Sequence, residues 1–406
     1  MGTWQPPRDL SAGEVRARFR QARRRGNPAW LWPDIAVADW RAALETIAEV
    51  ARDALFDRPG TAIADGDPDA FGLACYTSGM GPLLGWWQRR GLLRATPDIG
   101  RVIDLHHRHN AERSRRLTAA AADVTHRLHA AGVAVVPLKG ISTTAYFPAP
   151  GTRPMADIDL LVGARDLTTA EAVLAVAGFS AGRRGRRETT WRRPDAATAP
   201  HTLMFLHQDD PWSIDLHHSL DQPVAAGLPP IAFDAAEPMA NGAPRGLDQP
   251  LLLLHLATHA GGGLHNLSLL RLAELHFVAR SDAAAGRLSW PAFVQLGNAI
   301  GALGYAYPAL RLCEDLAPGT IPAEVIERCA AAAPARVVRV VDRLTPATAQ
   351  RVEGSSIAEH FMWARGWAGL SRQLAADLVP AAASWRRFWA IHERRVWQVL
   401  RGQVRA

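Results

Sequence analysis

The stretch from residue 133 to residue 220 limits the fold most strongly, because it reads as strand and turn in a chain that otherwise reads as helix. VAVVPL is a β-branched apolar run, typical of a buried strand, and it stops at Lys139 and Gly140, where the glycine permits a tight turn. ISTTAYF predicts a short helix, PAPGTRP a loop, and DIDLLV from Asp157 to Val162 the next strand. HTLMFLH and WSIDLHHSL predict two antiparallel strands joined at an Asp-Asp-Pro turn.

The parts of the chain on either side predict helices. Apolar residues recur three and four positions apart in DWRAALETIAEVARDAL and again in NLSLLRLAELHFVARS, as they do on the buried face of a helix. We therefore predict the α+β class with three parts. These are a helical N-terminal region at 1–127, a core with a mixed sheet and helices at 128–222, and a helical C-terminal domain at 223–406 that closes over the cleft of the core.

Composition excludes several classes of protein. The 406 residues are 48% apolar and 21% charged, which is typical of a globular chain. The strongest apolar run, LLLLHLATHA, reaches a histidine after four residues and is too short to span a bilayer. MGTWQPPRDLSAGEVRARFRQARRR lacks the apolar stretch of a secretory signal, so we expect a cytoplasmic protein. Cys75, Cys313 and Cys329 have neither paired nor metal-ligand spacing, which predicts reduced thiols in helices.

Lys139 is the single lysine among the 46 basic residues of the chain. Its compact ammonium on a flexible stem fits against a single phosphate oxygen in a tight turn, where a planar guanidinium does not. Chance survival of one lysine is the alternative interpretation. The net charge of +7 suits an anionic substrate but would serve solubility equally well.

The strand DIDLLV carries two carboxylates on one face. Successive side chains of a strand alternate between faces, so Asp157 and Asp159 project to one side while Ile158, Leu160 and Val162 project to the other. Two neighbouring carboxylates repel each other, and a cation between them relieves the repulsion. This strand therefore predicts a metal site.

A second strand supplies a third carboxylate. In WSIDLHHSL the alternation leaves Ser213, Asp215 and His217 on the face opposite the apolar side chains. If this strand lies beside DIDLLV, three aspartates converge with oxygen-only ligation, which favours magnesium or manganese over zinc. A solvated strand face is the alternative, but the turn at Lys139, the short helix and the loop at Arg153 stand in the order that a metal-dependent phosphate site uses.

The chain resembles the uncharacterised nucleotidyltransferase family of the polymerase-beta superfamily. The segments that carry the resemblance are VVPLKGISTTAYFPAPGTRPMADIDLLV and, further on, IDLHHSL. The region that begins at PLLLLHLATHA is similar to the family's downstream part, whereas residues 1 to 125 carry no recognised motif. The resemblance implies a polymerase-beta-type core in which Asp157 and Asp159 bind two metal ions and Asp215 completes the set. It also implies that Lys139 and Gly140 form the turn that faces the nucleotide phosphates.

The turn departs from the pattern of many superfamily members, which have a Gly-Ser pair there. In this chain Lys139 and Gly140 precede Ile141 and Ser142, so the triphosphate contacts stay open. Ser142 either supplies a hydroxyl to the phosphates or serves the start of the helix, since serine is a favoured cap. Arg153 is either a second cation for the phosphates or a solvated loop arginine.

The function that the resemblance implies is transfer of a nucleoside monophosphate from a nucleoside triphosphate to an acceptor, with release of pyrophosphate. Two Mg²⁺ ions, or Mn²⁺, are the expected cofactors, with Asp215 as the base and Lys139 and Arg153 neutralising phosphate charge. The acceptor, a small molecule, peptide or RNA, stays open, as do the base preference and the oligomeric state. The alternatives are a toxin-like or resistance-type enzyme that modifies tRNA or a drug, and a non-catalytic nucleotide-binding or regulatory module.

Four weaker patterns stay open. Residues 181–193 hold six arginines and one glutamate. This stretch either binds a polyanion such as a tRNA end or is a solvated face, and the sequence favours neither. His255 and His259, four apart on a predicted helix, lack the intervening glutamate of a zinc protease and are interpreted as domain-interface residues. His217 shares the face of Asp215 and either orients the acceptor or packs. The basic helix at the C-terminus packs internally or lies on a membrane surface.

Overall fold

The computed structural model describes residues 35–378, except 61, 186, 195–199, 203, 222–246, 265–266 and 351–356. It also describes the isolated residues 11, 13, 14, 17, 18, 389 and 393. The Arg-rich stretch therefore lies within the described residues except for position 186, whereas nearly all of the predicted C-terminal helix lies outside them.

A five-stranded mixed sheet forms the middle of the molecule. Its strands are β1 (Val135–Pro137), β2 (Asp157–Val162), β3 (Ser180–Arg184), β4 (Glu188–Arg192) and β5 (Ser213–His217), and their order across the sheet is β1-β2-β5-β4-β3. β2 and β5 run parallel, and every other neighbouring pair is antiparallel. The mixed α and β composition agrees with the predicted class, and the two Asp-bearing segments are adjacent strands.

The predicted strand at HTLMFLH is wrong. Its described residues form no strand, and β5 pairs instead with β4, which belongs to the Arg-rich stretch. The backbone N–H of Leu206 donates to Nδ1 of His106, and the side chains of Met204 and Phe205 are buried in the main apolar core. Met204 and Phe205 therefore pack in the core shared with helices, and a short apolar run alone does not distinguish this from a buried strand.

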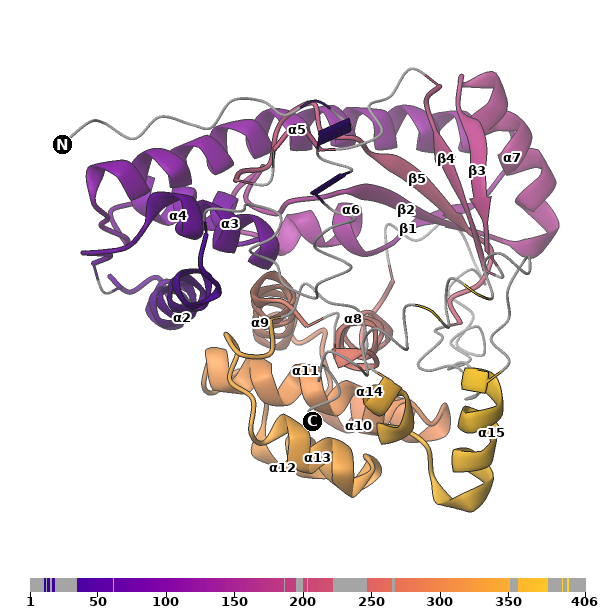
Figure 1. Cartoon of the computed structure of the whole chain (residues 1–406). Helices are drawn as coiled ribbons and strands as arrows, with labels where there is room; N and C mark the ends of the chain where they lie inside the picture. The colour runs from indigo at the N-terminus through magenta and orange to yellow at the C-terminus, as the bar shows by residue number, and fades with distance from the viewer. Residues whose placement is uncertain are drawn as a thin grey trace.

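Helices cover both faces of the sheet (Figure 1). On one face lie α5 (Pro97–Ala130), the long helix at the top of the view, and α7 (Leu167–Val176). On the other lie α8 (Leu251–Gly261) and α9 (Leu269–Ala284), which share an apolar core with Val136, Leu138 and Leu161 of the strand segments. Residues packed on the α5 face include Leu117, Val124, Leu128, Ile158, Leu160, Leu174, Ile214 and Leu216.

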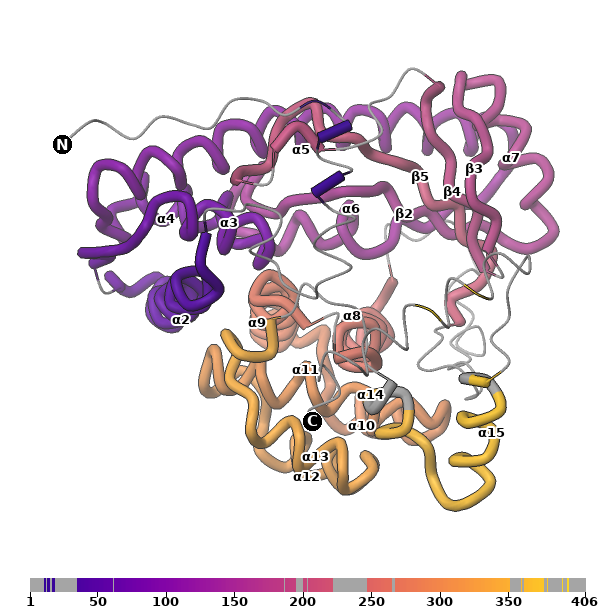
Figure 2. The backbone as a smooth tube through the Cα atoms, in the orientation of Figure 1, coloured from indigo at the N-terminus to yellow at the C-terminus, as the bar shows by residue number. Residues whose placement is uncertain are grey.

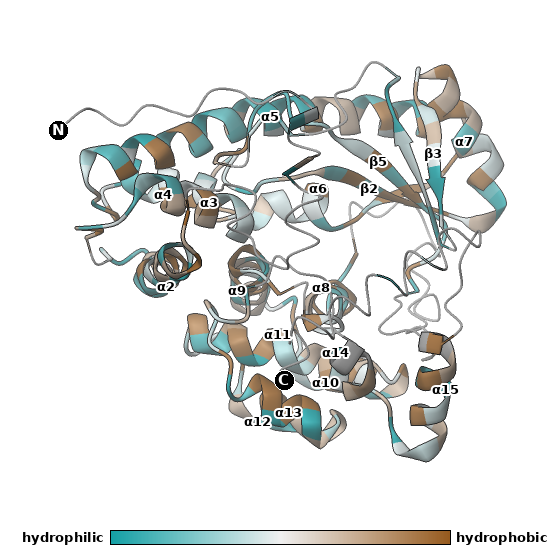
Figure 3. Cartoon of the chain, viewed as in Figure 1, coloured by the Kyte–Doolittle hydropathy of each residue, from teal (hydrophilic) through white to brown (hydrophobic). Residues whose placement is uncertain are grey.

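α5 is amphipathic over its whole length, and hydrophilic and hydrophobic bands alternate along it (Figure 3). Pro97 at its first turn and Asp98 nearby suit a helix N-terminus, and Arg127 and His129 in the last turn suit its C-terminus. The chain leaves the helix through Gly132, whose φ of 77° is the left-handed conformation that glycine adopts without strain.

The N-terminal and C-terminal helices meet below the sheet. Figure 2 draws α2 (Val37–Ala54) close to α9, and the ring nitrogen Nε2 of His276 in α9 lies 3.2 Å from the carbonyl oxygen of Leu55. One apolar core runs through both sets of helices. The predicted boundaries at 127/128 and 222/223 stay a prediction.

The remaining helices build the two ends of this core. The cysteines are free and buried, in α3, α11 and α12. Among the helices of the described residues, none has the length and apolar character needed to cross a membrane. The other elements are α3 (Pro68–Ser78), α4 (Gly81–Arg89), α6 (Lys139–Thr143), η2 (Thr144–Tyr146), η3 (Ala164–Asp166), α10 (Trp290–Ala299), α11 (Leu303–Leu316), α12 (Ala323–Ala332), α13 (Ala335–Val341), α14 (Ile357–Met362) and α15 (Gly366–Leu378).

Candidate active site

Three aspartates converge on the face of the sheet that looks toward α8 and α9. In the parallel pair of β2 and β5, Asp159 is opposite Asp215 and Asp157 is opposite Ser213. Because strand side chains alternate, all three carboxylates project to the same side as Leu161, which packs in the core shared with α8 and α9. One oxygen of each of Asp157, Asp159 and Asp215 lies within 4.8 Å of the others.

These carboxylates fit a divalent cation. Oδ1 of Asp215 is buried and has no hydrogen-bond partner among the described residues. Leaving a buried carboxylate oxygen unpaired costs free energy, and a cation at this position would satisfy it. An all-oxygen set suits Mg²⁺ or Mn²⁺ better than zinc.

The electrostatics of the three aspartates differ. Burial, together with repulsion from Asp159, raises the pKa of Asp157 to about 6. Burial also raises the pKa of Asp215. For Asp159 burial acts in the same direction, but Lys139 and His217 outweigh it and hold the pKa well below its usual range. Asp159 is therefore the permanently charged member of the set.

Lys139 reaches into this acidic cluster from the first residue of α6. Its Nζ lies 3.1 Å from Oδ1 of Asp159, with side-chain exposures of 18% and 3%. Its backbone φ of 33° is in the left-handed region, which non-glycine residues adopt at a cost in conformational energy. The single lysine of the chain thus stands at a strained turn with its ammonium directed at the metal-site carboxylates.

His217 is the second partner of Asp159. Its Nε2 lies 2.8 Å from Oδ1 of Asp159, and its Nδ1 lies 3.4 Å from Oε2 of Glu188, so the ring connects the two carboxylates. The side chain is almost fully buried. Glu188 is a contact that the sequence did not indicate, although its position opposite His217 follows from the β4–β5 register.

Arg153 is held by a residue from the C-terminal helices. Its Nε donates to Oε1 of Glu274 in α9 at 2.8 Å, and its Nη1 donates to the carbonyl oxygen of Pro154 at 3.1 Å. The two side chains are 11% and 5% exposed. Glu274 also accepts a hydrogen bond from the hydroxyl of Thr143 in α6. The two contacts of Glu274 tie the Lys139–Thr143 turn and Arg153 to α9. The guanidinium of Arg153, which the sequence suggested for the phosphates, is thereby paired with a carboxylate.

The other two residues of the turn have local contacts. A Cβ on Gly140 would lie 3.0 Å from Nη1 of Arg153 and 3.3 Å from Cγ of Met155, so glycine allows this close approach. The hydroxyl of Ser142 donates to the carbonyl oxygen of Lys139 at 2.9 Å within α6. Ser142 does not cap the helix through its side chain, because it lies inside α6.

Arg113 of α5 joins the segments that lead into both Asp-bearing strands. Its Nε donates to the carbonyl oxygen of Met155 at 3.0 Å, just before β2, and its Nη2 donates to that of Pro211 at 2.9 Å, just before β5. Nη1 donates to the carbonyl oxygen of Asp210. Arg113 is 2% exposed. Sequence reasoning missed it, since an arginine on an amphipathic helix reads as a solvated residue.

His255 and His259 of α8 stack with ring centroids 6.3 Å apart. Burial, followed by the charges of Lys139, His217 and Arg187, lowers the pKa of His255 to about 3. Burial, followed by the charge of Arg271 in α9, lowers the pKa of His259. His255 is buried, and the interpretation of the pair as domain-interface residues stays a prediction.

A second group that could hold a metal, His201, His207 and Asp210, serves its own loop. Both carboxylate oxygens of Asp210 accept backbone hydrogen bonds, from the N–H of His201 at 2.8 Å and from that of His207 at 2.9 Å. The two imidazoles stack with centroids 4.4 Å apart. These contacts close the loop before β5, which explains why the three side chains lie together.

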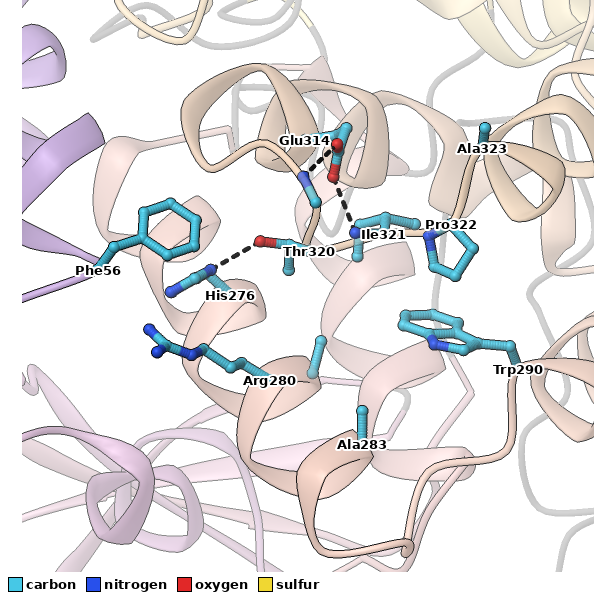
Figure 4. A pocket seen from close by; sticks show the side chains of 12 residues that line it. Phe56, His276, Arg280, Ala283, Trp290, Glu314, Thr320, Ile321, Pro322 and Ala323 are labelled. Atoms are coloured by element: carbon cyan, nitrogen blue, oxygen red, sulfur yellow. Dashed lines mark hydrogen bonds between the residues drawn. The ribbon is translucent and has the colours of Figure 1, made fainter.

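A cavity of about 490 Å³ opens on the opposite face of α9 (Figure 4). It is lined by His276 and Arg280 of α9, with Phe56 and Trp290 on either side. At about 100° per residue, His276 lies roughly 140° around the helix from Arg271, so the cavity faces away from the aspartates. Nδ1 of His276 lies 2.7 Å from the Thr320 hydroxyl.

A family model described as an uncharacterised nucleotidyltransferase matches residues 80–318. The match begins well before the motifs at 133 and takes in α5, the whole sheet, α8 and α9, so it includes the helices on both faces of the Asp-bearing strands. The comparison with curated proteins and the comparison with solved structures gave no match. Since the matched part is more than half of the 406 residues, the chain belongs to the uncharacterised nucleotidyltransferase family.

Proposed function

We propose that this chain is a divalent-metal-dependent nucleotidyltransferase that moves a nucleoside monophosphate from a nucleoside triphosphate to an acceptor. Membership of the family supports nucleotidyl transfer. The observation that carries the proposal is the convergence of Asp157, Asp159 and Asp215 with a buried, unpaired oxygen on Asp215. A solvated strand face would leave these oxygens in water, whereas Asp159 is 3% exposed.

In this proposal Asp157, Asp159 and Asp215 hold two Mg²⁺ ions. Bound divalent ions supply Lewis-acid stabilisation of the charge on the transferred phosphoryl group. A hydroxyl or amine of the acceptor attacks the α-phosphorus, the bond between that phosphorus and the bridging oxygen to the β-phosphate breaks, and pyrophosphate leaves. Asp215 takes the proton of the acceptor on a carboxylate oxygen.

The ammonium of Lys139 has two tasks in this scheme. It keeps Asp159 ionised, because a neighbouring cation favours the charged carboxylate. It also presents donors at the turn, where a phosphate oxygen would accept them. Arg153 supports the turn through Glu274, so its proposed part is to hold the Lys139–Thr143 turn against α9.

The acceptor stays open, and RNA is one candidate because arginines line β3 and β4. All five residues of β3 are exposed, so its arginines are accessible to a polyanion. Transfer of a labelled nucleoside monophosphate to tRNA would favour the tRNA-modifying alternative.

Calorimetric titration of each nucleoside triphosphate with Mg²⁺ tests the proposal. Wild type is expected to bind at least one triphosphate saturably and only with the metal, and the double variant Asp157→Asn, Asp159→Asn is expected to lose that binding. Asp123→Asn is the matched control, because Asp123 lies on the exposed side of α5 in an ion pair with Arg127. Absence of triphosphate binding to folded wild type would favour the non-catalytic module instead.

A further inference from the structure

Arg271 stands on the face of α9 that packs on the active-site turn. It lies three residues before Glu274, and residues three apart on a helix share a face. Glu274 bonds Arg153 and Thr143, which fixes this face of α9 against the Lys139–Thr143 turn. The contacts of Glu274 therefore place Arg271 on the side of α9 that faces the turn, and the side chain of Arg271 takes no part in them.

The charges that act on Arg271 include those of two of the aspartates. Burial lowers the pKa of its guanidinium, and Glu274, Asp157 and Asp159 act against that change. Arg271 is also the strongest charge acting on His259 of α8. Its guanidinium is therefore within electrostatic range of His259 in α8, of Glu274 and of the carboxylates of β2.

The guanidinium of Arg271 has no hydrogen bond or ion pair with any residue of the described chain, although its backbone N–H donates to Ser268. Glu274, the nearest carboxylate along the helix, is committed to Arg153 and Thr143. A partly buried arginine without a partner is costly, and such a cost is normally offset by an anion. The planar fork of a guanidinium matches two oxygens of one phosphate.

We propose that Arg271 binds the terminal phosphates of the nucleotide from the α9 side of the cleft, facing Lys139 across the triphosphate. The inference rests on the proposed function, because it names a phosphate contact of the same site. It also explains which cation serves the phosphates once Arg153 is paired with Glu274. The C-terminal helices then take part in substrate binding as well as in closing the core.

Comparison of a triphosphate with its monophosphate isolates this contact. The triphosphate that wild type binds most tightly is titrated with Mg²⁺ into wild type, Arg271→Ala, Arg271→Gln and Arg271→Lys, and the monophosphate of the same base is titrated in parallel. We expect Arg271→Ala and Arg271→Gln to bind the triphosphate about 10- to 100-fold more weakly, which corresponds to about 1.4 to 2.8 kcal/mol. The monophosphate affinity is expected to stay within about twofold, and Arg271→Lys is expected to retain part of the triphosphate affinity, since it keeps the charge without the fork.

Arg343→Ala is the matched control, because Arg343 is exposed and lies beyond α13. Circular dichroism and binding of Mn²⁺ followed by electron paramagnetic resonance show that each variant keeps its fold and its carboxylates. Arg271→Gln keeps a polar side chain and serves as the test if the alanine variant does not fold.

The outcomes separate the two proposals. Triphosphate binding by Arg271→Gln as tight as that of wild type would overturn the role of Arg271 and leave the proposed function standing. An equal loss of triphosphate and monophosphate binding would also overturn it, because the residue would then shape the site without contacting the terminal phosphates. A wild type that binds Mn²⁺ but no triphosphate would overturn the proposed function, and the inference with it.

Discussion

Replacing Arg113 with methionine is expected to destabilise the fold far more than a surface position on the same helix would suggest. The guanidinium donates to the carbonyl oxygens of Met155, Asp210 and Pro211, and all three contacts disappear in Arg113→Met. A hydrogen bond from a charged donor contributes about 1.5 to 3 kcal/mol, and a buried carbonyl left unpaired keeps its desolvation cost. Because water can replace part of the lost bonding, we expect the free energy of unfolding to fall by about 4 kcal/mol.

Arg115→Met on the same helix is the control. Its guanidinium is 69% exposed and pairs with Glu112 one turn away, so its loss is expected to leave the free energy of unfolding nearly unchanged. Urea unfolding followed by circular dichroism gives both free energies, and Mn²⁺ titration gives the metal affinity. Mn²⁺ binding is expected to weaken only in Arg113→Met, because Arg113 aligns the segments that precede β2 and β5. Equal unfolding midpoints for the two variants would refute the reasoning, since the three carbonyls would then have other donors.

Three further predictions concern the turn, the metal and the buried histidines. Gly140→Ala places a Cβ 3.0 Å from Nη1 of Arg153 and should lower the free energy of unfolding by about 1 to 2 kcal/mol, measured by urea unfolding. Mg²⁺ at 100 times its dissociation constant should stabilise wild type by about 2.7 kcal/mol and leave the Asp157→Asn, Asp159→Asn variant unchanged in thermal unfolding. His106 has its pKa lowered by burial from 6.5 to about 4 and is neutral when folded, whereas the unfolded chain binds a proton below 6.5. Its contribution is therefore complete above pH 6.5 and is lost as the pH falls toward 4, by about 1.4 kcal/mol per pH unit, and His106→Gln should flatten this part of the stability profile.

The sequence carried enough information to predict the two Asp-bearing strands and the shared face of their carboxylates. Strand alternation is a local property, so the positions of Asp157 and Asp159 on one face follow from six consecutive residues. That β5 lies beside β2 is a tertiary fact, which the sequence analysis could state only as a condition, and the register now pairs Asp159 with Asp215. The assigned roles of these residues in metal binding and catalysis stay predictions.

The strand prediction at HTLMFLH is wrong because a local pattern does not show tertiary contacts. Its short run of consecutive apolar residues suits a buried strand, but such a run indicates only that the side chains are buried and not what they are buried against. Met204 packs close to Gly72 of α3, and the N–H of Leu206 bonds to His106 of α5. The opposite holds for the Arg-rich stretch, to which the sequence analysis assigned no strand although it forms the hairpin of β3 and β4.

The support of the turn could not be predicted, because its members are distant in sequence. Glu274 is 121 residues from Arg153, and nothing in ELHFVARS distinguishes this glutamate from a solvated one. The ion pair between Arg153 and Glu274 changes the roles that can be assigned to the nearby cations. Arg153 is neutralised by Glu274, and Lys139 is shared with Asp159, so the two cations that the sequence assigned to the phosphates are both engaged with carboxylates. Under the proposed function, Arg271 on the same helix as Glu274 adds a positive charge for the triphosphate, because its guanidinium has no side-chain partner among the described residues.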